Sequence, residues 1–199
     1  MEKELVFATH NPHKLEEVRQ MLPPGFRLLS LSDIGCMETI PETAETLEGN
    51  ARLKAAHVQQ HYGYDCIADD TGLEVEALNG APGVYSARYA GPEGNAKANC
   101  EKLLTALADT DHRSARFRTI IALTEGDTFH YFEGVAQGEI LRAPQGEGGF
   151  GYDPIFRPTG HSRSFAELTR DEKNRISHRG KAFRALQAFM EDAGAHKPG

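Results

Sequence analysis

Two adjacent carboxylates, Asp69 and Asp70, come directly after a short apolar segment at residues 65–68. We expect this segment to be a strand, and open α/β sheets bind ligands at the carboxyl ends of their strands. Adjacent like charges favour a bound cation, and Mg²⁺ usually takes only one or two carboxylates from a protein. The pair therefore predicts a magnesium site formed by Asp70 and a glutamate from residues 42–48. The alternative is an acidic turn, because Asp, Thr and Gly are ordinary turn residues.

A second polar group, residues 9–14, lies where a predicted strand at residues 5–8 leads into a helix. Asn11 is suited to the N-cap of that helix and Pro12 to its first turn. The free N–H groups and the dipole at a helix N-terminus favour phosphate, and Lys14 would add a positive charge. The segment indicates phosphate binding. The alternative is a capped surface helix with a solvated lysine.

A glycine-rich segment at residues 146–151 has the spacing of a dinucleotide-binding fingerprint. That motif requires a strand before it and a helix after it, and the flanking Pro144 and Pro154 leave neither. We instead expect a loop that presents Phe150 and Asp153 to a flat heterocycle, with glycines that permit close approach of the backbone. The alternative is a flexible hairpin tip with a core phenylalanine.

Four basic residues surround the beginning of the last predicted helix, which Ser177 caps: Lys173, Arg175, His178 and Arg179. Positive charges in the first turn of a helix oppose its dipole. This arrangement suggests that a bound anion or a carbonyl oxygen compensates them. The alternative is a solvated basic surface, which is the common role of such clusters.

The size of 199 residues and the apolar content of 39% are typical of one globular domain, or of one domain with two lobes. The net charge of −7 argues against general nucleic-acid binding, because affinity for nucleic acids depends on basic surface. The apolar runs are too short to cross a membrane, and residues 1–10 lack the features of a secretory signal. We therefore expect a cytoplasmic protein.

The three cysteines are odd in number and widely spaced, which predicts reduced, structural thiols and neither a disulfide nor a thiolate zinc site: Cys36, Cys66 and Cys100. The remaining histidines, including His57, His61 and His112, have no metal-ligand partner at a useful spacing. They are predicted to be surface residues. No Ser-His-Asp or Cys-His arrangement suggests nucleophilic catalysis.

The predicted elements alternate between strands and helices, which indicates the α/β class. Residues 116–123 and 129–136 flank a turn at 125–127 as an antiparallel hairpin, so the sheet is mixed. Further strands are predicted at 5–8, 27–31, 65–68 and 73–77, and helices after residue 12 and at 46–61, 94–108 and 177–192.

Six motifs lie in order along the chain: Thr9-x-Asn11-x-x-Lys14, Asn50-Ala51 with Lys54-Ala55, Ala68 to Leu73, Gly83 to Arg88, Gly149 to Pro154, and Ser177 to Arg179. Together they resemble the inosine triphosphatase family, and the match extends from residue 4 to about residue 190. The family more often has glycine at position 44, phenylalanine at 47 and an acidic residue at 49. An ungapped alignment to Asn50 favours Glu42 over Glu45 as the metal glutamate.

This resemblance implies an α/β fold with an elongated mixed β-sheet, flanking helices and two lobes around a central nucleotide cleft. It also implies a single domain over residues 1–199 that forms a homodimer. Asp70 would be the catalytic base and, with Glu42, a magnesium ligand, while Asp69 and Lys54 would support them. The implied substrate contacts form a larger set: Thr9, His10, Asn11, Pro12, His13, Lys14, Thr71, Phe150, Gly151, Tyr152, Asp153, Lys173, His178 and Arg179.

The activity implied by the resemblance is magnesium-dependent hydrolysis of the deaminated purine triphosphates ITP, dITP and XTP to monophosphate and pyrophosphate. Such an enzyme would keep these bases out of DNA and RNA, and it implies no nucleic-acid or membrane partner. Two alternatives stay open: a purine-nucleotide sensor that does not hydrolyse its ligand, and a pyrophosphatase for modified pyrimidine triphosphates. A sensor needs no paired carboxylates such as Asp69 and Asp70, which favours an enzyme.

Overall fold

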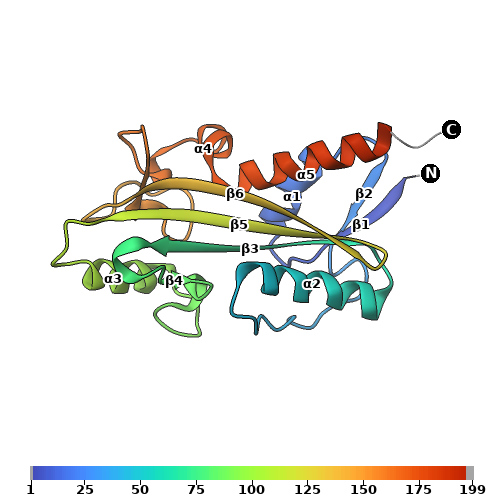
Figure 1. The fold of residues 1–199 in the computed structure, drawn as a ribbon, viewed down its shortest axis with the longest axis horizontal. Helices are drawn as coiled ribbons and strands as arrows, with labels where there is room; N and C mark the ends of the chain where they lie inside the picture. Colours follow the sequence, from blue (N-terminus) through green and yellow to red (C-terminus); the bar gives the residue numbers. More distant parts are fainter. Residues whose placement is uncertain (1, 196–199) are drawn as a thin grey trace. The chain divides into compact units, whose positions relative to one another are not determined.

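The computed structural model describes residues 2–195, without the side chains of residues 13, 194 and 195. Its strands form a mixed seven-stranded sheet in the order β2-β1-β3-β5-β6-β7, with β4 paired to β3. Helices flank this sheet (Figure 1). The strands are β1 Lys3–Phe7, β2 Phe26–Leu29, β3 Cys66–Val75, β4 Pro82–Gly83, β5 Ser114–Glu125, β6 Thr128–Ile140 and β7 Phe156–Pro158. The α-helices are α1 Pro12–Met21, α2 Leu47–Tyr62, α3 Ala96–Ala106, α4 Arg170–Ile176 and α5 His178–Ala195. The 3-10 helices are η1 Glu76–Leu78, η2 Ser86–Arg88, η3 Asp153–Ile155 and η4 Phe165–Glu167.

The chain forms two compact units. Unit 1 comprises the described residues up to Asp70, residues 120–133 and the described residues from Ala182 onward. Unit 2 comprises Thr71–Thr119 and Gly134–Lys181. Strands β3, β5 and β6 and helix α5 contribute residues to both units, and each unit has its own hydrophobic core.

In unit 1, α1 and α5 pack on one face of the sheet, and α2 lies on the other (Figure 1). Because side chains of a strand alternate between faces, Leu5, Phe7 and Ile67 join the same core cluster as the apolar faces of α1 and α5. The ring of Phe183 contacts that of Phe7 edge-on, with the centroids 6.0 Å apart. On the other side, α2 buries mostly small side chains: Leu47, Asn50, Ala51, Ala55 and Val58.

In unit 2, the core forms where α3 and the loops after β6 cover the sheet. Phe117 of β5 lies at its centre, with its ring centroid 4.6 Å from that of Phe156 and 5.8 Å from that of Phe165. The predicted hairpin of β5 and β6 is confirmed, with Gly126 and Asp127 between the two strands.

The sequence signals for helix starts are confirmed. Helix α1 begins at Pro12, and the N–H of Lys14 donates to Oδ1 of Asn11 at 3.4 Å. Helix α2 follows Thr46, whose side chain accepts from the N–H of Gly49. Helix α5 begins directly after Ser177, whose Oγ accepts from the N–H of residue 180 at 3.0 Å. These caps satisfy N–H groups that have no partner inside the helix.

The predicted end of a strand before the acidic pair is wrong. Asp69 and Asp70 lie in the middle of one continuous strand, β3. Pairing with neighbouring strands outweighs the turn propensity of Asp, Thr and Gly, because strand formation depends on tertiary context more than on intrinsic preference. Strand β1, however, ends at Phe7, which pairs with Ile67. The two carboxylates therefore lie just beyond the last paired residues of β1.

Two further elements differ from the predictions. Pro82 and Gly83, which are residue types typical of turns and are not among the predicted strands, form β4 and pair with residues 73 and 74 of β3. Helix α4 is absent from the predicted elements, although its capping box was readable: Thr169 accepts from the N–H of Glu172, and the Glu172 side chain accepts from the N–H of Thr169. With seven residues, α4 is too short to show an apolar period.

All three cysteines are free and buried, as predicted. No helix among residues 2–195 is long and apolar enough to cross a membrane.

Candidate active site

In unit 1, residues 9–14 comprise most of the loop after β1 and the first residues of α1. The N–H of Asn11 donates to Oγ1 of Thr9 at 3.1 Å, and Asn11 in turn caps the helix. Pro12 occupies the first helical position, and Nε2 of His10 lies 3.3 Å from the carbonyl oxygen of Glu38. The side chain of His13 lies outside the described part of the chain. This loop leads into a helix N-terminus, which attracts anions.

Lys14 joins this loop to the acidic pair. Its Nζ donates to both carboxylate oxygens of Asp69, at 3.0 and 3.3 Å. The Asp69 side chain is buried, whereas that of Lys14 keeps 23% of its surface exposed. Asp69 is therefore placed to hold the lysine ammonium at the phosphate-binding loop.

Lys54 of α2 is the buried centre of the acidic group. Its Nζ donates to Oε1 of Glu42 at 2.9 Å and to the carbonyl oxygen of Asp69 at 2.5 Å. Burial alone would lower the pKa of Lys54, but the charges of Asp69, Glu42 and Asp70 outweigh burial and raise it. Lys54 is thus positively charged at neutral pH.

The environment of Asp70 makes its carboxyl a weaker acid. Burial raises its pKa to about 6, Lys54 opposes the rise, and the carboxylate of Glu42 adds to it. Three carboxylates lie around Lys54, those of Glu42, Asp69 and Asp70, and Asp69 also accepts from Lys14. Carboxylate oxygens beside a phosphate-binding loop are the ligands that Mg²⁺ prefers.

Asn50 positions the segment that carries Glu42. It is fully buried, and its Oδ1 accepts from the N–H of Ala44 at 2.9 Å, which ties this segment to α2. Glu42 reaches Lys54, whereas Glu45 is exposed. These contacts favour Glu42 as the metal ligand. No functional role was predicted for Asn50, although it stands in one of the six motifs.

In unit 2, two of the predicted residues are anchored inside the fold. Oγ1 of Thr71 lies 2.7 Å from Oγ1 of Thr119 on the neighbouring strand β5. Tyr152 is buried in the core, and its hydroxyl donates to the carbonyl oxygen of Ser86 at 2.6 Å. Tyr152 therefore fixes the glycine-rich loop through its hydroxyl and packs its ring in the core.

Asp153 organises that loop. It is buried, and its Oδ2 accepts from the N–H of Phe150 at 3.0 Å and from Nζ of Lys173 at 2.6 Å. Gly149 has a φ of +68°, and a Cβ there would overlap Oδ2 of Asp153, so the close approach requires glycine. The chain before the loop is irregular and η3 follows it, which confirms that the strand and helix of a dinucleotide-binding motif are missing.

Phe150 is presented outward by this loop. Its side chain is exposed over 57% of its surface. Nζ of Lys173 lies 4.5 Å from its ring centroid and Cζ of Arg179 lies 5.3 Å from it. Gly151 follows with a φ of +60°. An exposed ring between two cations offers a stacking surface for a base together with charges that attract phosphate or an oxo group.

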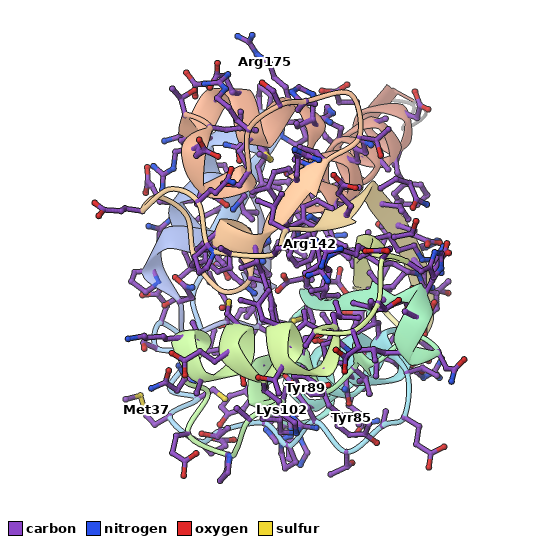
Figure 2. The ribbon with its side chains drawn as sticks, turned by 90° about the vertical axis from the view of Figure 1, so that its left-hand side faces the viewer. Met37, Tyr85, Tyr89, Lys102, Arg142 and Arg175 are labelled. Atoms are coloured by element: carbon purple, nitrogen blue, oxygen red, sulfur yellow. The ribbon has the colours of Figure 1, made fainter. Side chains whose placement is uncertain are left out.

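The predicted basic cluster separates into residues with different surroundings. His178 is buried, and its ring stacks on that of Phe117 with centroids 4.6 Å apart. Lys173 and Arg179 lie at the ring of Phe150. Arg175 is exposed and extends outward from α4 (Figure 2).

The predicted residues thus form two groups. Unit 1 holds those expected to bind triphosphate and metal: Thr9, His10, Asn11, Pro12, Lys14, Glu42, Lys54, Asp69 and Asp70. Unit 2 holds those expected to bind the base: Thr71, Phe150, Gly151, Tyr152, Asp153, Lys173, His178 and Arg179.

Known proteins match this fold and these motifs over nearly the whole chain. The model of the Ham1 family matches residues 5–189. The dITP/XTP pyrophosphatase of Flavobacterium psychrophilum is 56% identical over 189 residues, covering 95% of this chain and 100% of that protein. The dITP/XTP pyrophosphatase of Porphyromonas gingivalis is 56% identical over 191 residues, covering 96% of this chain and 98% of that protein.

Among solved structures, the Ham1 protein of Staphylococcus aureus superposes with a TM-score of 0.91 at 41% identity, covering 96% of this chain and 100% of that one. The chain belongs to the Ham1 family. The resemblance to the inosine triphosphatase family and the mixed α/β fold are confirmed.

Proposed function

We propose that this chain hydrolyses the deaminated purine nucleoside triphosphates dITP, ITP and XTP to the monophosphate and pyrophosphate, and so cleanses the nucleotide pool. The observation that carries the proposal is Asp70, partly buried near Lys54 with its pKa raised to about 6, in an acidic group next to a phosphate-binding loop. Relatives with the name dITP/XTP pyrophosphatase at 56% identity support the substrate class.

In this proposal, Asp70 accepts a proton from the water that attacks the α-phosphorus. A carboxylate with a pKa of about 6 is largely ionised at pH 7.5, and it is a stronger base than an exposed aspartate. Lys14 and the N-terminus of α1 bind the triphosphate oxygens. Asp70 and Glu42 would hold magnesium, which when bound neutralises phosphate charge as pyrophosphate leaves.

The residues of unit 2 would bind the base. Phe150 stacks on the purine, while Arg179 or His178 and backbone N–H groups donate to the 6-oxo group that hypoxanthine and xanthine share. Adenine has an amino group at this position. A buried donor facing another donor costs about 1–3 kcal/mol, so ATP is expected to be a poor substrate.

Phe150→Ala tests this assignment. Because base stacking on an aromatic ring contributes about 1–3 kcal/mol, we expect the KM for ITP to rise roughly tenfold. The free energy of unfolding should change little, since the ring is exposed over 57% of its surface. Steady-state kinetics and thermal unfolding measure the two effects. Tyr131→Ala, which removes another exposed ring, is the matched control. An equal rise in KM in both variants would contradict the assignment.

A substrate panel tests the activity itself. The purified protein is incubated with ITP, dITP, XTP, ATP, GTP, dTTP and modified pyrimidine triphosphates, with magnesium or EDTA, and pyrophosphate, orthophosphate and monophosphate are quantified. We expect magnesium-dependent pyrophosphate from the first three alone. Tight ITP binding without turnover would indicate a sensor, and turnover of modified pyrimidines alone would indicate the other pyrophosphatase class.

The proposal includes the remaining implications of the family resemblance: one domain over residues 1–199, a homodimer, a cytoplasmic location, and no nucleic-acid or membrane partner. Size-exclusion chromatography coupled to light scattering measures the molar mass of the protein in solution. A mass of twice the 21.9 kDa chain is expected.

A further inference from the structure

Cys36, Glu38 and His57 of unit 1 converge outside the predicted active site. Among the residues that the structure describes, they are the one group of three such side chains whose ligand atoms all lie within 4.8 Å of one another. The sequence analysis found no metal-ligand partner for His57 at a useful spacing, and the packing of the fold supplies two candidate partners. The partners stand 19 and 21 positions away along the chain, so no spacing rule connects them.

Each of the three side chains is held in place. The N–H of Cys36 donates to the carbonyl oxygen of Leu31 at 2.9 Å and closes a turn, and the cysteine is fully buried. His57 lies on α2, and its ring stacks on that of His61 with centroids 4.3 Å apart. The imidazole Nε2 faces Oε1 of Glu38 at 3.0 Å.

The carboxylate of Glu38 is oriented by a second residue of α2. The hydroxyl of Tyr62 donates to Oε1 of Glu38 at 2.8 Å and lies 3.1 Å from Oε2. The hydrogen bond with His57 lowers the pKa of Glu38 to about 2, so this side chain is ionised at neutral pH. Between Cys36 and Glu38, the Met37 side chain is 74% exposed and points outward (Figure 2).

The combination of one sulfur, one imidazole nitrogen and one carboxylate oxygen matches the ligands of zinc and differs from those of magnesium, which takes oxygen alone. Two atoms 3.0 Å apart, as Nε2 of His57 and Oε1 of Glu38 are, can both contact an ion at about 2.0–2.1 Å. In a tetrahedral site the sulfur lies about 3.6 Å from each of these two atoms. Because the three ligand atoms already lie within 4.8 Å of one another, the sulfur would have to move by about 1 Å at most.

We propose that Cys36, Glu38 and His57 form a binding site for a thiophilic transition-metal ion, Zn²⁺ by preference, with water as the fourth ligand. The site shares no residue with the magnesium ligands proposed above, and it does not depend on the proposed activity. Because the carbonyl oxygen of Glu38 lies 3.3 Å from Nε2 of His10, a bound ion would also order the segment beside the phosphate-binding loop.

The test uses the full-length protein without an affinity tag, stripped of metal, in an Asp70→Asn background that weakens metal binding at the active site. Cobalt serves as the spectroscopic probe, since thiolate ligation produces a sulfur-to-cobalt charge-transfer band in the near ultraviolet. Zinc affinity is measured by competition with a chromophoric chelator. We expect one cobalt ion with the band, and one zinc ion bound.

Cys36→Ser is expected to abolish the band. Cys36→Ser and His57→Gln are each expected to lower zinc affinity at least about 100-fold. Loss of a residue that only orients a metal ligand already lowers affinity about 10–100-fold, and these two residues are proposed to be ligands themselves. Cys100→Ser and His161→Gln, at an exposed histidine of unit 2, are the matched controls and should keep both properties. Circular dichroism confirms that each variant is folded. The proposal is wrong if the band is absent in the parent protein or persists in Cys36→Ser, or if Cys36→Ser binds zinc as tightly as the parent.

Discussion

Asp70→Asn is expected to lower kcat for ITP about 1,000-fold or more, while the dissociation constant of ITP changes only a few-fold. The amide neither accepts the proton of the attacking water nor supplies a full charge to magnesium, and loss of a general base alone costs 10²–10⁴-fold. Pyrophosphate release under single-turnover conditions measures the first quantity, and equilibrium binding of ITP the second.

Asp127→Asn is the matched control for this variant, because it makes the same chemical change at the exposed hairpin turn between β5 and β6. It should retain the turnover of the parent protein. Full turnover in Asp70→Asn would remove Asp70 from the mechanism. A loss confined to ITP binding would assign it to substrate binding alone.

The same variant is expected to be more stable than the parent in the absence of magnesium. A raised pKa means that the folded state favours the protonated carboxyl, so the stabilising contribution of Asp70 is present below about pH 4 and is lost as pH rises through about 6. At pH 7.5 the ionised, partly buried carboxylate destabilises the fold by up to about 3 kcal/mol, which the neutral amide avoids. Denaturant unfolding should show this difference shrinking between pH 7 and pH 4. An Asp70→Asn protein less stable than the parent at pH 7.5 would contradict the prediction.

Lys54→Met is the second large prediction. It removes the ammonium that donates to the Glu42 carboxylate and to the Asp69 carbonyl oxygen and that attracts the charge of Asp70, and breaking a buried pair by removing one partner costs about 3–5 kcal/mol. Because the pKa of Lys54 is raised, its stabilising charge is fully present at pH 7.5 and would be lost only at strongly alkaline pH. We expect the free energy of unfolding to fall by about 3 kcal/mol at pH 7.5, and by less at pH 5, where Asp70 is largely protonated.

A double-mutant cycle sharpens this test. In the Asp70→Asn background one carboxylate is already neutral, so Lys54→Met should cost at least about 0.5 kcal/mol less than in the parent protein. Lys97→Met, at an exposed position of α3, controls for the loss of a lysine and should change stability by less than about 0.5 kcal/mol. Additive effects of the two substitutions would show that Lys54 and Asp70 do not interact.

Local sequence patterns correctly predicted the parts of the fold that depend on short stretches of chain. The cap residues Asn11, Thr46 and Ser177 begin helices where their side chains satisfy nearby N–H groups, and such bonds span only three residues. The turn at residues 125–127 between two strand segments likewise predicted the β5–β6 hairpin. Strand β3 was misjudged at Asp69 and Asp70, because its continuity comes from partners that lie far away in the sequence.

The residue types and their order by themselves determined the chemistry that this protein carries: paired carboxylates, a phosphate-binding helix start and a glycine-rich loop with Phe150. Tertiary structure alone decided how these groups act. It partly buried Asp70 near Lys54 and raised the pKa of the carboxyl, and it packed Tyr152 into a core. It also brought Cys36 to His57 across 21 positions. Desolvation and electrostatic interaction depend on distance in space, which only the packing of helices against the sheet sets.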